Sequence, residues 1–170
     1  MNKENLSYVY RIKNFLKYMG KVLNYIWPVL LCIGGGFLAS LLQRSAIAEW
    51  YPSLQKPMIT PPAVAFPIVW AVLYVMMGLS LSFLMSRRPA SWLLGLWGAQ
   101  LALNFLWSLL FFMCRNPFWG LVDIVLLDFL VVLYIVKVYT TCAVSSWLFV
   151  PYALWLFLAT YLNAYIVFNN

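Results

Sequence analysis

Long stretches of the chain lack charged residues and are almost wholly apolar. Four stretches contain no Asp, Glu, Lys or Arg: 22–43, 57–86, 89–114 and 138–170. A helix needs about 20 predominantly apolar residues to cross a bilayer, so each stretch can hold one crossing. A further apolar stretch holds two carboxylates, Asp123 and Asp128. The pattern therefore predicts five spans, at about 23–43, 65–86, 91–113, 117–139 and 145–168.

Composition supports a membrane protein over a soluble one. Hydrophobic residues make up 65% of the chain and charged residues 9%, whereas soluble domains are about one quarter charged. Each apolar window is too long and too evenly apolar for the alternating pattern of a barrel strand. We therefore expect an all-α membrane protein, a five-transmembrane-helix bundle with a long loop between helices 1 and 2, and a membrane domain over residues 23–170.

The first 22 residues form a basic segment with a helical pattern. Its apolar residues recur at helical spacing, and its basic residues occupy other faces: Ile12, Phe15, Leu16 and Met19 against Arg11, Lys13, Lys17 and Lys21. This pattern is typical of a helix lying on an anionic lipid surface. Because the segment directly precedes a membrane span, we expect it to bind lipid and not nucleic acid.

Basic residues are unequally divided between the two sides of the predicted topology. Eight lie on the side of the N-terminus: Lys3, Arg11, Lys13, Lys17, Lys21, Arg87, Arg88 and Lys137. Three lie on the other side: Arg44, Lys56 and Arg115. Positive residues favour the cytoplasmic side. We therefore expect a multi-pass integral protein of a bacterial-type cell membrane, with a cytoplasmic N-terminus.

Conventional catalytic chemistry has little support in the sequence. The chain has no histidine, so it lacks the commonest metal ligand and general base. No nucleophile elbow, phosphate loop or HExxH motif is present. The three cysteines fit no metal or disulfide spacing and are expected to be small buried side chains: Cys32, Cys114 and Cys142.

Aromatic and amide side chains gather instead on one face of each of three predicted spans. Span two offers Trp70, Tyr74 and Met77; span three offers Gln100, Asn104, Ser108 and Phe111, with Trp107 beside Asn104; span five offers Trp155, Ala159 and Asn163, with Leu162 adjacent. An amide facing lipid would cost several kcal/mol, so these faces should point into the bundle. They predict either a ligand pocket or a purely structural set of interhelical hydrogen bonds.

Four sequence blocks resemble a known family. They are the connector and span-two block (Trp50-Tyr51, Leu54, Lys56-Pro57, Pro61-Pro62, Val69-Trp70, Leu73-Tyr74, Met77-Gly78), QLALNFLWSLLFF from Gln100, Leu121-Val122-Asp123, and PYALWLFLATYLNAYI from Pro151. Their order and spacing resemble the translocator protein family, also called tryptophan-rich sensory proteins (TspO/MBR) and peripheral benzodiazepine receptors. The resemblance covers all but about the first 25 residues.

The resemblance implies a five-helix bundle, commonly a homodimer, that binds protoporphyrin IX and isoquinoline- or benzodiazepine-type ligands and requires no cofactor. The residues that match the family's pocket are Trp70, Asn104 and Trp155. Tyr51 and Pro61 match contacts from the connector, which caps the pocket. Wall positions are matched by Tyr74, Trp107, Ala159 and Leu162.

Three functions are compatible with this resemblance. The first is a porphyrin-binding protein acting in porphyrin homeostasis or stress sensing. The second is an enzyme that degrades porphyrin with light and oxygen, with Trp70 and Trp155 as its catalytic residues. The third is a transporter of porphyrin or lipid. Cholesterol is not an expected partner, because no Lys or Arg follows Tyr165 where the animal recognition pattern needs one.

Overall fold

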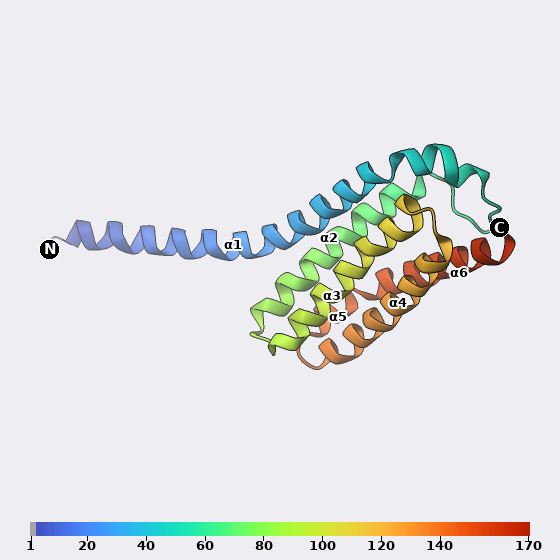
Figure 1. Ribbon diagram of the computed structural model, residues 1–170. Helices are drawn as coiled ribbons and strands as arrows, with labels where there is room; N and C mark the ends of the chain where they lie inside the picture. Colours follow the sequence, from blue (N-terminus) through green and yellow to red (C-terminus); the bar gives the residue numbers. More distant parts are fainter. Residues whose placement is uncertain (1–2) are drawn as a thin grey trace.

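The computed structural model describes residues 3–170 and, within them, consists of helices and connecting segments (Figure 1). The elements are α1 (Lys3–Leu42), the short π-helix η1 (Ala46–Trp50), the 3-10 helix η2 (Tyr51–Ser53), α2 (Ala65–Ser86), α3 (Ser91–Ser108), the short π-helix η3 (Leu109–Met113), α4 (Pro117–Tyr139), α5 (Ala143–Trp147) and α6 (Val150–Asn169). The predicted all-α fold is confirmed.

Four segments of the described chain are long and apolar enough to cross a membrane: Tyr10–Leu42, Ala65–Ser86, Ser91–Met113 and Ala143–Asn169. They correspond to the predicted spans one, two, three and five. The predicted span four forms α4, a helix of 23 residues that is not among these four. The count of five spans therefore stays a prediction.

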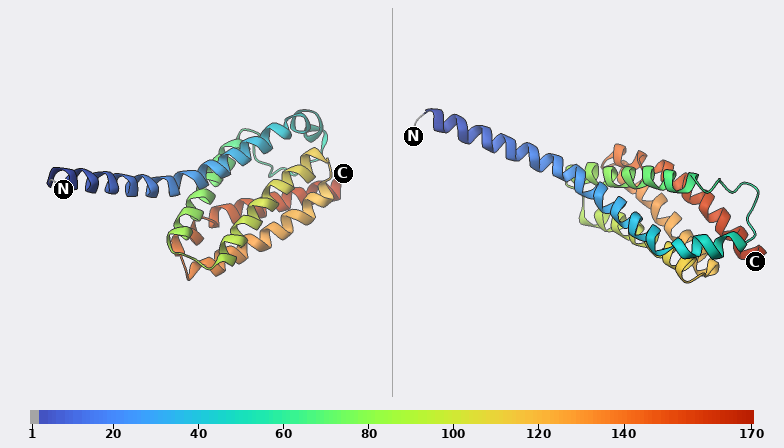
Figure 2. Two further views of the ribbon diagram at one scale, coloured as in Figure 1. Left: turned by 60° about the vertical axis from the view of Figure 1, so that its left-hand side comes forward. Right: turned by 90° about the horizontal axis from the view of Figure 1, so that it is seen from above.

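The N-terminal half of α1 projects away from the bundle (Figure 1; Figure 2). The helix continues without a break from Lys3 to Leu42 and passes through Pro28. Its outer part exposes large apolar side chains, including Phe15, Leu16 and Tyr18. No change in secondary structure marks the predicted boundary at residue 22, and the placement of residues 3–22 on a lipid surface stays a prediction.

Glycines allow α1 to pack closely on the bundle. A Cβ on Gly78 of α2 would lie 2.6 Å from the backbone nitrogen of Val29 in α1. A Cβ on Gly36 would meet the Tyr74 ring, and one on Gly35 would meet the Phe105 ring. Gly35 and Gly36 thus permit close contact between helices. These glycines bring the first span against the face that carries Tyr74.

A buried hydroxyl cluster joins three helices at the end away from the connector. Ser80 of α2, Tyr134 of α4 and Ser145 of α5 lie within 2.7–2.9 Å of one another, and all three are fully buried. Because every hydroxyl has partners, the cluster fixes the helices without leaving an unpaired polar group. At the opposite end, the connector between α1 and α2 approaches the C-terminus of α6 (Figure 1).

All three cysteines have free thiols. Cys32 and Cys142 are buried, as expected of small apolar side chains, whereas Cys114 is exposed in the turn before α4. Asn116 follows this turn and caps α4, because its side chain accepts a hydrogen bond from the backbone nitrogen of Trp119 at 3.2 Å. Pro117 begins the helix, where a missing N–H costs nothing.

Candidate ligand-binding site between α2, α3 and α6

The centre of the candidate site is a hydrogen-bonded chain of three side chains from three helices. The Tyr74 hydroxyl of α2 donates to Asn104 Oδ1 of α3 at 3.0 Å. Asn104 Nδ2 donates in turn to the Tyr152 hydroxyl of α6 at 3.0 Å. All three residues are buried. The amide predicted to face the interior therefore does so, and it joins α2 to α6 through α3.

Trp70 extends this centre with an aromatic wall. Its indole stacks on the Tyr74 ring, with centroids 5.5 Å apart and planes inclined by 29°. It also meets the Tyr152 ring edge-on at 6.3 Å. Stacked and edge-on pairs at these distances are the favoured aromatic geometries. Trp70 is only partly buried, so its indole lies at the edge of the cluster and remains accessible.

A second cluster lies nearer the connector. The Trp107 indole N–H donates to Asn163 Oδ1 at 3.0 Å, and Asn163 Nδ2 donates to the backbone oxygen of Pro117 at 2.8 Å. The Trp107 ring stacks on Phe111 at 5.1 Å. Tyr51 of the connector meets Phe111 with centroids 6.4 Å apart. Thus Tyr51 and Trp107 both contact Phe111 and lie in one cluster.

The predicted cap on the site is a folded structure with its own internal support. The Lys56 ammonium donates to the backbone oxygens of Tyr51 at 2.8 Å, Leu54 at 3.0 Å and Pro52 at 3.4 Å. It also lies 4.7 Å from the centroid of the Tyr51 ring. The Lys56 charge is therefore engaged within the connector.

Further contacts attach the connector to the rest of the protein. The Asn170 side chain accepts from the Gln55 backbone nitrogen at 2.8 Å and donates to the Gln55 backbone oxygen at 3.3 Å. An exposed ion pair joins Glu49 to Arg115 at 3.8 Å, and such surface pairs contribute little. Burial raises the pKa of the Tyr51 phenol above its ordinary value, so this side chain stays uncharged in the connector.

The role of Lys56 leads to a prediction. Lys56→Met removes a cationic donor shared by three carbonyls, which should weaken the folded connector by about 1–2 kcal/mol and raise its opening equilibrium about 5- to 30-fold. Proteolysis within residues 51–60 should speed up accordingly. Arg44→Met is the matched control, because Arg44 is exposed and lies before the folded turn. Equal cleavage of both variants would show that the Lys56 contacts do not hold the connector.

The remaining predicted residues lie on α6. Trp155 contacts Phe66 of α2 edge-on at 5.6 Å. Ala159 packs against the hydrophobic core, and Leu162 is buried. Pro61 is half-buried in the connector, four residues before α2 begins. The structure thus brings Trp155 to the α2 side of the bundle.

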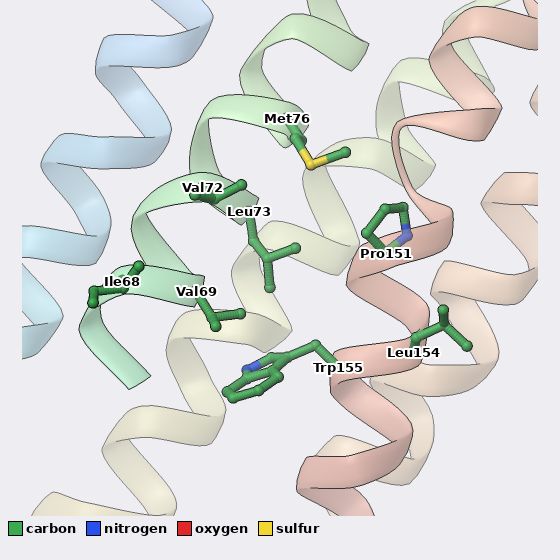
Figure 3. Close-up of a pocket in the computed structure, with 8 residues that line it drawn as sticks. All are labelled: Ile68, Val69, Val72, Leu73, Met76, Pro151, Leu154 and Trp155. Atoms are coloured by element: carbon green, nitrogen blue, oxygen red, sulfur yellow. The ribbon is translucent and has the colours of Figure 1, made fainter. Parts of the chain in front are cut away.

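A cavity of about 410 Å³ lies between α2 and α6 (Figure 3). Its principal lining residues are Val69, Leu73 and Met76 from α2, with Pro151, Leu154 and Trp155 from α6. Trp155 thus faces this cavity, in addition to contacting Phe66. The cavity wall is apolar, and it lies beside the hydrogen-bonded centre described above.

Sequence reasoning missed Tyr152, which completes the central chain. The signal was present, because Tyr152 lies three residues before Trp155 and such a pair shares a helix face. Asp128, whose role the sequence left open, faces α6: its Oδ2 accepts from the Thr160 hydroxyl at 2.7 Å. This places the carboxylate at a helix contact within the bundle.

Comparison with known proteins shows the family of the chain. The sequence pattern of the TspO/MBR family matches residues 28–168. The chain is 35% identical over 158 residues to the tryptophan-rich protein TspO of Archaeoglobus fulgidus, covering 88% of this chain and 98% of that protein.

Similarity extends to a bacterial and an animal protein. The chain is 35% identical over 118 residues to the protein CrtK of Rhodobacter capsulatus, covering 67% of this chain and 74% of that protein. It is 36% identical over 135 residues to the translocator protein of Sus scrofa, covering 76% of this chain and 79% of that protein. Together with its apolar helices, these matches make it an integral membrane protein. The chain belongs to the TspO/MBR family.

Proposed function

We propose that this protein binds protoporphyrin IX or a closely related tetrapyrrole within the membrane and acts in porphyrin homeostasis or stress sensing. The observation that carries the proposal is the meeting of Trp70, Tyr74, Asn104 and Tyr152 from three helices. A porphyrin is a flat apolar disc with carboxylates on one edge. Aromatic rings give it contact area, and a few placed polar groups orient it.

The hydrogen bonds of the centre suggest how a carboxylate or carbonyl would be held. Asn104 Nδ2 uses one of its two N–H groups in the bond to Tyr152, while Oδ1 accepts from Tyr74. A ligand carboxylate or carbonyl that replaces the Tyr152 contact accepts from both the amide N–H and the Tyr152 hydroxyl. Binding by exchange keeps every buried polar group paired, whereas a purely apolar pocket would leave the ligand carboxylate or carbonyl without a donor.

The same proposal includes the topology and assembly that the family implies. α4 runs from the connector end of the bundle to the opposite end (Figure 1), and we propose it as the fifth span. The N-terminus then lies in the cytoplasm of a bacterial-type cell, and the connector lies outside. We further propose a homodimer that also accepts isoquinoline- or benzodiazepine-type ligands, since these share the flat apolar shape of the tetrapyrrole.

Titration of the purified protein with protoporphyrin IX, followed by tryptophan fluorescence, tests the proposal. Trp155→Ala should weaken binding by about tenfold, because it removes a large aromatic wall and its buried contacts. Trp92→Ala is the matched control. It also removes one tryptophan, but Trp92 is 54% exposed at the start of α3, and its loss should leave affinity unchanged.

Several outcomes separate the alternatives. Equal affinity of the two variants would contradict a site beside Trp155. A new tetrapyrrole product that forms only under light and oxygen would add the enzymatic function. Accumulation of porphyrin inside sealed vesicles would be needed for transport.

A further inference from the structure

The cavity between α2 and α6 is a groove, because it opens on the outer surface of the bundle. The opening faces away from the centre formed by Tyr74, Asn104 and Tyr152. Three rim residues are strongly exposed: Ile68 at 60%, Val72 at 54% and Leu154 at 65%. α2 and α6 both belong to segments that are apolar enough to cross a membrane. The medium at this opening is therefore the hydrocarbon of the bilayer. We propose that the groove is a binding site for a single acyl chain of a membrane lipid.

The chemistry of the lining matches an acyl chain. Every lining residue is apolar, and the floor is formed by Val69, Leu73 and the Trp155 ring (Figure 3). Nothing in this lining would hold a charged or strongly hydrated ligand edge. A chain lying in the groove contacts two helices at once, so it gains more dispersion contacts than a chain against a single convex helix. This distinguishes a bound chain from ordinary surrounding lipid.

Aromatic contacts also join the two helices that line the groove. The Phe66 and Trp155 ring centroids are 5.6 Å apart, and those of Trp70 and Tyr152 are 6.3 Å apart. Trp155 lines the groove, whereas Trp70, Tyr152 and Asn104 are not among its lining residues. The groove and the proposed tetrapyrrole site are therefore neighbours, and the lipid proposal does not depend on the tetrapyrrole proposal.

The depth of the groove selects a leaflet. Its α2 wall runs from Ile68 to Met76, beginning three residues after the start of α2 and ending at the middle of the helix. At 1.5 Å per residue this wall is about 12 Å long, and half of the hydrocarbon core is about 15 Å thick. The groove thus runs from near the connector side to the bilayer centre. We assign it to a chain of the leaflet on the connector side.

Photolabelling tests the assignment. The full chain is placed in phosphatidylcholine vesicles that contain a trace of phosphatidylcholine with a diazirine in mid-chain, and the labelled residues are mapped by mass spectrometry. Val72 and Leu154 should carry several-fold more adduct than Val125. Val125 is a matched control, because it is a valine of 53% exposure eight residues into α4, against 54% for Val72 seven residues into α2.

Two further arms sharpen the test. Leu154→Phe narrows the groove and should abolish the excess label on Val72 while label on Val125 stays constant. Probe loaded into one leaflet by cyclodextrin exchange should label the groove only from the connector side. Equal labelling of Val72 and Val125 in the parent protein would overturn the proposal. So would cross-linking of Val72 between two chains without lipid adducts, since the groove would then be a contact between copies.

Discussion

Replacing Asn104 by leucine is expected to lower stability and to weaken tetrapyrrole binding strongly. The substitution leaves the buried hydroxyls of Tyr74 and Tyr152 without their amide partner. Hydrogen bonds between membrane helices average about 0.6 kcal/mol and reach about 1.7 kcal/mol, so losing two should cost about 1–3 kcal/mol. Affinity should fall more than about tenfold, since a hydrogen bond to a charged group contributes about 1.5–3 kcal/mol.

The measurements are detergent-induced unfolding and porphyrin titration, and Gln100→Leu is the control. Gln100 lies one turn before Asn104 and is fully buried. Neither of its amide atoms has a hydrogen-bond partner within residues 3–170. The same amide-to-leucine change should therefore be neutral or stabilising at this position. If both variants lose stability and affinity equally, the hydrogen bonds of Asn104 are not the cause.

Gly78→Ala should disrupt the packing of α1 on α2. The new Cβ would lie 2.6 Å from the Val29 backbone nitrogen, and a backbone cannot rotate away as a side chain can. Overpacking of this kind costs about 1–3 kcal/mol and occasionally more, and we expect the upper part of that range. Porphyrin affinity should also fall, because Gly36 of α1 packs on the Tyr74 ring.

Gly98→Ala provides the comparison for this substitution. Gly98 lies in α3, and a Cβ added at this position would meet no atom of a neighbouring residue within 4 Å. Alanine is favoured over glycine in a helix by about 1 kcal/mol, so this variant should be at least as stable as the parent. Detergent-induced unfolding of both variants compares their stabilities with that of the parent. A Gly78→Ala protein as stable as the parent would mean that α1 can shift without cost.

Helix positions were the most predictable feature of the fold. The predicted ranges 65–86 and 117–139 coincide with α2 and α4, because charged, Pro or Asn residues stand at both ends of each apolar run. The single predicted span 145–168 is instead divided into α5 and α6 around Leu148 and Phe149. Hydropathy is uniform there, so it carries no sign of the break.

The candidate site was predictable in outline but not in its connections. Helical spacing placed Trp70 and Tyr74 on one face and Asn104 on another, and the structure brings these faces together. Partner choice depends on the rotation and height of each helix, which spacing within a single helix does not specify. Spacing puts Tyr152 on the same helix face as Trp155, but for this reason it does not predict the hydrogen bond to Asn104. The three carbonyls around Lys56 depend likewise on the path of an irregular connector.

The most direct test of the central claim is the fluorescence titration of the parent protein with protoporphyrin IX in lipid nanodiscs. The chain contains nine tryptophans, and Trp70 and Trp155 lie beside the proposed site. We predict quenching that saturates at one porphyrin per chain and is reversed by an excess of a competing isoquinoline ligand. Quenching that rises with porphyrin without saturation, as in protein-free partition into lipid, and that no competitor reverses would contradict the account.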